Sequence, residues 1–217
     1  MTTKQDVLEK AKEYGIDLTL LYENLSLTPT ERIEKLKNTL EFVEELRKPG
    51  SKEQSKAKDV LTHLKEFDVD FIIIGGMATI ARGSTNIPIT NDIDICYARD
   101  KKNLVNLVKA LTPFHPHLRG APKDLPFTFD EKTLEIGLNF PLSTDAGYID
   151  LIGEVSGLGN YDEVLKYSEK LQIYDMECYF LTIEGLIKNK KVAGKEKDLR
   201  AVIELEALLQ IKKDKEK

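Results

Sequence analysis

The amino-acid sequence predicts an α+β protein that carries a helical segment at each end. In residues 1–50, apolar side chains recur at spacings of three and four, which is typical of one face of an amphipathic helix. Residues 71–74 form a short, wholly apolar run and residues 89–97 alternate, and both patterns favour strands. Helical spacing returns at 183–190 and 195–211. This order indicates a helical cap, a core of strands and helices, and a helical tail.

Three helices are expected in the N-terminal segment. The first ends at Gly15, a residue type that favours helix C-termini, and Asp17 is placed to cap the second. The third begins at 28–31, where Thr-Pro-Thr-Glu combines a capping box with proline at the first helical position. The Lys-Pro-Gly-Ser run at 48–51 then breaks the pattern. We therefore divide the chain into an N-terminal helical segment (1–50), a core (51–181) and a C-terminal helical segment (182–217).

Within the core, helical and strand patterns alternate along the chain. The apolar run 71–74 is predicted to be a strand buried on both faces, because it has no polar position facing water. The other elements expected in the core are helices at 57–66, 77–82 and 103–111, strands at 89–97, 133–141 and 148–152, and short strands around Ile173 and Tyr179.

Composition argues against a membrane-spanning, secreted or disulfide-rich protein. The chain has 32 Lys and Arg residues against 37 Asp and Glu residues, a net charge of −5. No apolar run approaches the roughly 18 residues that a membrane span needs, so no membrane partner is expected. The first residues lack the apolar stretch of a secretory signal, and Cys96 and Cys178 lie too far apart for a disulfide framework or a metal pair. We expect a cytoplasmic globular protein.

A glycine pair follows the buried strand directly. Gly75 and Gly76 permit a tight turn into a helix, with backbone N–H groups exposed to a phosphate. Alone the signal is weak, because such a turn more often only reverses the chain. Ser84 and Thr85 are also candidates for phosphate contacts, although loops favour both residue types.

Acidic residues mark two of the predicted strands. Asp92 and Asp94 are two residues apart, so their side chains project from the same face, while Ile93 points into the core. Two carboxylates this close repel each other unless a cation joins them, and Mg²⁺ binds carboxylates together with substrate phosphates. The alternative is a solvent-facing strand edge. Asp150, in the strand 148–152, would add a third carboxylate and complete a cluster able to hold two metal ions.

Together these residues resemble the signature of the nucleotidyltransferase superfamily, the fold shared with DNA polymerase beta and antibiotic nucleotidyltransferases. That signature is an apolar strand, Gly-Gly, a short helix, Asp-x-Asp on the next strand and a third acid later. The resemblance spans roughly residues 67–210 and implies a nucleotidyltransferase core with a mixed sheet flanked by helices. It also implies an enzyme that takes a nucleoside triphosphate as co-substrate and uses two Mg²⁺ ions.

The resemblance assigns roles to individual residues. The implied metal-binding and catalytic carboxylates are Asp92, Asp94 and Asp150. Asp150 has the alternative role of accepting the proton of the attacking hydroxyl. The implied triphosphate contacts in the core are Gly75, Gly76 and Thr90. Pro88 stands where many members have an arginine, and Arg82 is the candidate to replace it.

The C-terminal segment is similar to the end of the AbiEii-like toxin nucleotidyltransferases. Residues 186–190, followed by Gly-Lys-Glu-Lys-Asp-Leu at 194–199, resemble their Lys…Gly-Arg-x-Lys-Asp-Leu segment. This similarity implies Lys190, and second Lys197, as cations for the triphosphate. Residues 188–200 contain six basic residues against two acidic ones, a local charge of +4. A toxin-like enzyme implies an RNA or protein acceptor, and a cognate antitoxin as a partner.

The acceptor stays open among three classes. An RNA end, such as that of a tRNA, or a protein hydroxyl agrees with the toxin-like ending and the basic segment. A small molecule would be the acceptor in an antibiotic-type enzyme, bound between the core and the helical tail. A non-catalytic nucleotide-binding or interaction protein is the third class, and the presence of all three acids speaks against it.

Overall fold

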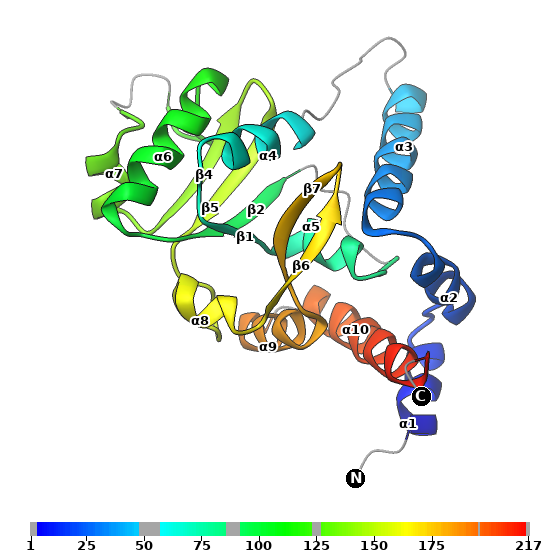
Figure 1. The fold of residues 1–217 in the computed structure, drawn as a ribbon. Coiled ribbons are helices and arrows are strands. Elements are labelled where there is room, and N and C mark those ends of the chain that lie inside the picture. Colours follow the sequence, from blue (N-terminus) through cyan, green and yellow to red (C-terminus); the bar gives the residue numbers. More distant parts are fainter. Residues whose placement is uncertain (1–3, 48–56, 86–91, 123–126, 195, 216–217) are drawn as a thin grey trace.

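A central mixed sheet organises the chain. The computed structural model describes residues 4–47, 57–85, 92–122, 127–194 and 196–215 (Figure 1). Among these residues, seven strands form one sheet in the order β3-β4-β5-β2-β1-β7-β6. Strand β1 pairs antiparallel with β2 and parallel with β7, while β2 pairs parallel with β5. The predicted α+β class and its mixed sheet flanked by helices are confirmed.

Helices precede, interrupt and follow the strands. The strands are β1 Phe71–Ile73, β2 Ile93–Tyr97, β3 His117–Leu118, β4 Asn139–Thr144, β5 Gly147–Ile152, β6 Ser168–Ile173 and β7 Met176–Leu181. The α-helices are α1 Lys4–Glu13, α2 Leu18–Ser26, α3 Pro29–Arg47, α4 Ala57–Glu66, α5 Gly75–Ala81, α6 Lys101–Leu111, α7 Glu131–Ile136, α8 Tyr161–Leu165, α9 Ile183–Ala193 and α10 Glu196–Lys215, and a 3₁₀ turn, η1, spans Thr112–Phe114. Helices α4 and α6 contact each other, and α9 and α10 pack together at another end of the molecule (Figure 1).

The parallel pair β2–β5 forms the part of the core that supports the acids. Ile93 and Ile95 of β2 and Ile149 and Leu151 of β5 are almost wholly buried. The residues between them face the other side of the sheet, because successive strand side chains alternate. Burial of these four apolar side chains therefore fixes which face of the sheet carries the polar residues between them. A one-residue slip in the pairing would turn the apolar side chains to the opposite face.

The prediction of a strand at 133–141 is wrong for the first half of that segment. Residues Glu131–Ile136 form helix α7, and the strand β4 begins only at Asn139. Asp130 caps the helix by accepting a 2.8 Å hydrogen bond from the backbone N–H of Thr133. Leu134 is fully buried, so tertiary packing and the cap together outweigh the weak strand pattern. The strand predicted at 89–97 begins at Ile93 in the described part, and residues 89–91 lie outside it.

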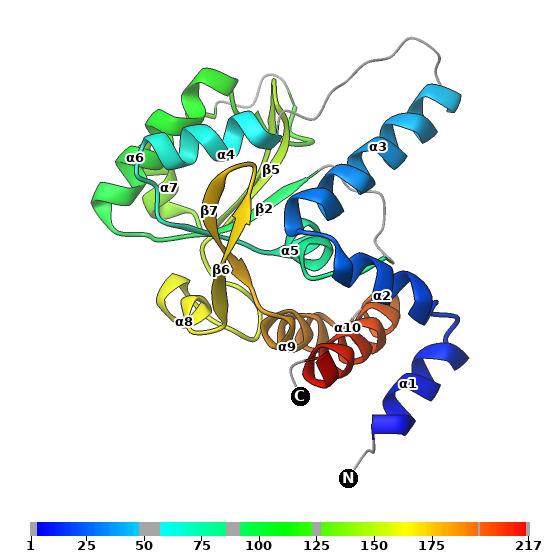
Figure 2. The ribbon, with the colours of Figure 1, turned by 45° about the vertical axis from the view of Figure 1, so that its right-hand side comes forward.

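Of the N-terminal helices, α3 packs against α5 of the core, whereas α1 packs against α10 of the tail (Figure 2). Arg32 of α3 donates to the carbonyl oxygens of Asn24 and Ala81. The side-chain amide of Asn24 donates to the carbonyl oxygens of Gly83 and Ser84 at 3.4 and 3.5 Å. These contacts anchor the end of α5 and the chain that leaves it. The predicted break at 48–51 lies outside the described residues.

Two predicted helix starts are confirmed in the N-terminal segment. The carboxylate of Asp17 accepts hydrogen bonds from the backbone N–H groups of Thr19 and Leu20. Thr28 and Glu31 form the capping box, with the backbone N–H of Thr28 donating to Glu31 at 2.7 Å.

A buried glutamate on α10 holds the chain after α5. Glu204 accepts from the hydroxyl of Ser84 at 2.8 Å and from the backbone N–H and hydroxyl of Thr85 at 2.7 and 2.9 Å. The side chain has no exposed surface. The hydroxyls of Ser84 and Thr85, which the sequence suggested for phosphate, therefore bind Glu204, and the tail helix holds these two residues in place.

No helix in the described part of the chain has an apolar stretch long enough to cross a membrane.

The substitution Glu204→Ala is expected to lower the free energy of unfolding by about 2–3 kcal/mol, because it leaves the buried hydroxyl of Ser84 and the donors of Thr85 without their acceptor. Urea unfolding measures the difference. The matched control is Glu206→Gln on the same helix, which removes a partly exposed pair with Lys191 and should change stability by less than about 0.5 kcal/mol. Equal losses in the two variants would contradict the role given to Glu204.

Candidate functional site

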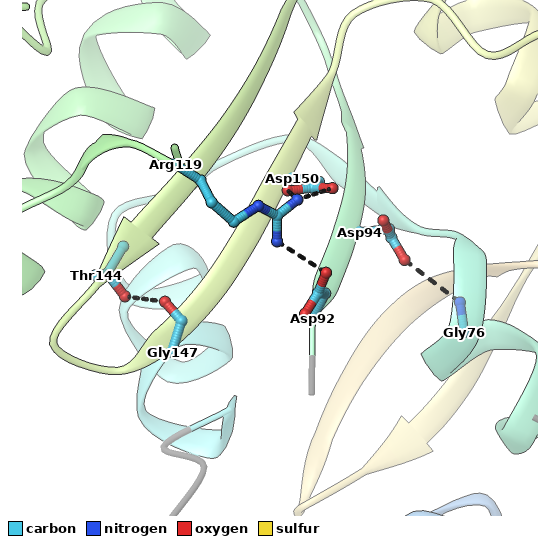
Figure 3. A network of polar contacts seen from close by, with 7 residues as sticks. All are labelled: Gly76, Asp92, Asp94, Arg119, Thr144, Gly147 and Asp150. Carbon is cyan, nitrogen blue, oxygen red and sulfur yellow. Dashed lines mark hydrogen bonds and ion pairs between the residues drawn. The ribbon is translucent and has the colours of Figure 1, made fainter. Parts of the chain in front are cut away.

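Three carboxylates lie together on one face of the β2–β5 pair. Asp94 of β2 is the register partner of Asp150 on β5, so their side chains leave the sheet side by side. Asp92 lies two residues before Asp94 and projects from the same face (Figure 3). We call Asp92, Asp94 and Asp150 the acid cluster. The structure thus brings together the three acids that the sequence singled out.

A guanidinium group, which sequence reasoning missed, joins two of these acids. Arg119 follows β3, and its side chain reaches across the sheet (Figure 3). It donates to Oδ2 of Asp92 at 2.8 Å and to Oδ1 and Oδ2 of Asp150 at 2.8 and 2.9 Å. The carboxylates of Asp92 and Asp150 are only 25% and 21% exposed, so these pairs are shielded from water more than ordinary surface pairs.

Asp94 is the most strongly perturbed acid of the cluster. Its pKa is raised to about 6, chiefly by burial and also by the negative charges of Asp150 and Asp92, while the hydrogen bond from Gly76 and the charge of Arg119 act in the opposite direction. Burial also raises the pKa of Asp150, while Arg119 opposes that shift. Asp94 and Asp150 are thus held where ionisation costs free energy unless a cation is near.

The glycine pair lets Asp94 approach the start of α5. A side chain at Gly75 would place its Cβ 2.0 Å from Oδ2 of Asp94, and Gly75 has a left-handed φ of +57°. The backbone N–H of Gly76 donates to the same oxygen at 3.3 Å. The glycines therefore serve the acid cluster directly in this structure, and their contact with a triphosphate stays a prediction.

The structure records no contact between the acid cluster and the other residues predicted to bind the triphosphate, as far as these are described. Thr90 lies outside the described residues, and so does the side chain of Lys197, although its backbone is in the first turn of α10. Nζ of Lys190 lies 3.6 Å from the carboxylate of Asp198. Arg82 is buried, and its guanidinium donates to Glu169 and to two carbonyl oxygens of β7, so it does not replace the arginine expected near Pro88.

The basic segment 188–200 is partnered within the protein where its side chains are described. Lys188 donates to the hydroxyl of Tyr167 at 3.1 Å, and Lys191 donates to Glu206 at 2.7 Å. Arg200 donates to the carbonyl oxygen of Gly15. Together with the Lys190–Asp198 pair, these contacts engage much of the local charge of +4, from which the sequence led us to expect one lysine to bind the triphosphate.

The acid cluster fits a hard divalent cation by its chemistry. Its donors are carboxylate oxygens, which Mg²⁺ prefers. As the acids lie in this structure, no group of three or more His, Cys, Asp or Glu within the described ranges could by itself hold a metal ion. The guanidinium of Arg119 lies between Asp92 and Asp150, where it already supplies one positive charge.

No protein-family model matches the sequence, and no curated protein matches it. Among solved structures, the fold is similar to a lincosamide antibiotic adenylyltransferase with lincomycin bound. The TM-score is 0.46 and the identity 14%, over 70% of this chain and 98% of that chain. This likeness is too slight to assign a substrate or the role of any residue. The similarity to AbiEii-like toxins stays a prediction.

In metal-free protein, Asp94→Asn is expected to raise the free energy of unfolding at pH 7.5 by about 2 kcal/mol, because it removes a carboxylate that burial and like charges oppose. The pKa of Asp94 is raised in the folded state, so the gain is fully present above about pH 6 and disappears as the pH falls toward 4. Urea unfolding with a chelator at several pH values measures it. Asp145→Asn, at an exposed acid, is the control, and an Asp94→Asn protein no more stable than wild type at pH 7.5 would contradict the electrostatic account.

Gly75→Ala is expected to destabilise the protein by several kcal/mol, because the new Cβ meets Oδ2 of Asp94 in addition to the backbone cost of a left-handed φ. Gly15→Ala is the matched control: its φ is +71° and nothing lies within 4 Å of its Cβ, so it should cost only about 1–2 kcal/mol. Thermal unfolding compares the two. Equal losses would show that Asp94 does not lie against Gly75.

Proposed function

We propose that the protein is a Mg²⁺-dependent nucleotidyltransferase, which transfers a nucleoside monophosphate from a nucleoside triphosphate to an acceptor hydroxyl. The observation that carries the proposal is the acid cluster: three carboxylates on one face of two parallel strands, close enough for one guanidinium to bridge two of them. Because like charges at this spacing repel, a fold that gathers them needs cations at that place. A triphosphate with its metal ions supplies cations there only when substrate is bound.

Two Mg²⁺ ions held by Asp92, Asp94 and Asp150 would neutralise the triphosphate and the leaving pyrophosphate. The protein's own part is positioning. The register of β2 with β5 and the hydrogen bond from Gly76 hold Asp94 in place before substrate arrives. Asp150 has raised proton affinity and is placed either as a ligand or as the acceptor of the proton of the attacking hydroxyl.

In the reaction, the acceptor oxygen forms a bond to the α-phosphorus. The bond from that phosphorus to the bridging oxygen of the β-phosphate breaks, and pyrophosphate leaves with the electron pair. The hydroxyl proton passes to a carboxylate oxygen of Asp150. Catalysis by this chain is positioning and charge neutralisation, so no covalent intermediate with the protein is required.

We infer that Lys190 is the first candidate among the tail cations for binding the triphosphate. Its Nζ lies 3.6 Å from Asp198, a looser pair than the 2.7 Å pair of Lys191 with Glu206. Lys197 is the second candidate, and Gly75, Gly76 and Thr90 are the proposed contacts from the core. A looser pair costs less free energy to break when a phosphate competes for the ammonium group.

The acceptor divides the proposal into two forms. The first form, an RNA end or a protein hydroxyl with a cognate antitoxin, depends on the toxin-like ending at 186–199. The second form, a small-molecule acceptor, is favoured by the internal partners of Lys188, Lys190 and Lys191, which leave less unpaired charge for a polyanion. Both forms use the same acid cluster.

The acceptor test follows labelled nucleotide. The protein is incubated with each α-labelled nucleoside triphosphate, Mg²⁺ and a cell extract, and the label is traced to RNA, protein or small molecules. Label on RNA or protein supports the first form, and label on a small molecule supports the second. No transfer with any nucleotide would favour the non-catalytic reading of the fold.

Asp94→Ala is expected to reduce transfer of label at least about a thousandfold, because removal of a metal carboxylate raises the barrier by several kcal/mol. Initial rates of pyrophosphate release measure the loss once an acceptor is found. Asp145→Ala, at an exposed acid in the turn between β4 and β5, is the control and should retain wild-type rates. Near-wild-type transfer by the Asp94→Ala protein would overturn the assignment of the acid cluster.

A further inference from the structure

We propose that Arg119 is an internal counter-ion that competes with the divalent cation for Asp92 and Asp150. On this proposal, which rests on the proposed function, the guanidinium holds the acid cluster together in metal-free protein and has to leave Asp150 before a metal binds there. Arg119 would thereby lower the affinity of the resting site for metal.

The sheet register explains how a residue from the edge of the sheet reaches the cluster. The backbone N–H of Arg119 donates to the carbonyl oxygen of Pro141 on β4 at 2.9 Å. Pro141 is the register partner of Asp150, and Asp150 is the partner of Asp94. Arg119, Pro141, Asp150 and Asp94 thus form one row across the sheet. Strands lie about 5 Å apart, so an extended arginine side chain crosses β4 and ends at β5 and β2 (Figure 3).

The guanidinium uses the oxygen atoms that a metal would use. Both carboxylate oxygens of Asp150 accept from Arg119, and so does Oδ2 of Asp92. Oδ2 of Asp94 accepts from Gly76 instead. A divalent cation between Asp92 and Asp150 would meet a fixed positive charge as well as occupied lone pairs, so the two cations exclude each other there.

Tyr148 already contacts the guanidinium in this structure and, on this proposal, keeps that contact when the acids are released. Tyr148 lies two residues before Asp150 on the same face of β5, and its ring centroid lies 4.9 Å from the guanidinium carbon of Arg119. The ring is 46% exposed and attracts a cation through its face. The main-chain bond to Pro141 does not involve the side chain, so the guanidinium can leave the carboxylates while β3 stays paired.

The test measures metal binding without substrate. Mn²⁺, which has an electron paramagnetic resonance signal, is titrated into wild type, Arg119→Gln and Arg119→Lys. Arg119→Gln is expected to bind Mn²⁺ about tenfold or more tightly than wild type, since charge-assisted bonds to the acids no longer have to be broken. Arg119→Lys keeps the charge but not the bidentate geometry, and is expected to lie between the two.

Lys170→Gln is the matched control. Lys170 pairs with the carboxylate of Glu177 at 2.6 Å and lies over the ring of Tyr179, so it repeats the cation, acid and tyrosine combination on the β6–β7 hairpin away from the acid cluster. Its Mn²⁺ affinity should equal that of wild type. Circular dichroism and thermal unfolding verify that each variant is folded.

The outcomes separate this inference from the proposed function. Tighter binding in Arg119→Gln, an intermediate affinity in Arg119→Lys and wild-type affinity in Lys170→Gln support the competition. Wild type that binds Mn²⁺ as tightly as Arg119→Gln, or more tightly, overturns the competition and leaves the metal site intact. Absence of Mn²⁺ binding in every folded variant overturns the inference. The proposed function, in which metal arrives with the triphosphate, fails separately if Asp94→Ala keeps near-wild-type transfer.

Discussion

Mutual repulsion among three carboxylates on one face of the β2–β5 pair is the constraint on which the rest of the site depends. Asp94 and Asp150 are register partners, and Asp92 shares their face. Arg119 bridges two of these acids, and the N–H of Gly76 satisfies an oxygen of the third. Without such partners, ionised acids at this spacing would oppose folding. In this structure the cluster is therefore held together by Arg119 and the backbone of Gly76, and on the proposed function a substrate-bound metal would take over the role of Arg119.

Apolar burial beneath the sheet is what allows this arrangement to persist. Ile93, Ile95, Ile149 and Leu151 are almost wholly buried, and a slip in the pairing of β2 with β5 would expose them. The acids therefore remain aligned because their neighbours along each strand are packed below. The free energy gained by burying these apolar side chains compensates the electrostatic repulsion among the acids. Such compensation is common at functional sites that gather charge before a ligand binds.

The sequence predicts the acids and the glycine pair because both depend on local rules: alternation along a strand and the turn that follows an apolar run. Arg119 and Glu204 could not be found in this way. Arg119 follows a strand of two residues at the edge of the sheet, and Glu204 binds Ser84 from 120 positions along the chain, so only the folded topology brings them into place. The segment of helix α7 is predicted to be a strand from its local pattern. Its helical conformation depends instead on the Asp130 cap and on the burial of Leu134, which the pattern does not reveal. The sequence shows that the tail is basic, but it does not show that Lys190 and Lys191 pair with acids of α10. Those pairs depend on how α9 packs against α10.

The central claim is that the acid cluster is a cation site from which Arg119 is displaced. Crystals grown with Mn²⁺ and a non-hydrolysable nucleoside triphosphate analogue test it most directly, through the anomalous scattering of manganese. The account predicts an anomalous peak bounded by Asp92, Asp94 and Asp150, with the guanidinium of Arg119 turned away from Asp150. A guanidinium still bridging Asp92 and Asp150, with nucleotide bound elsewhere and no peak among the three acids, would contradict it.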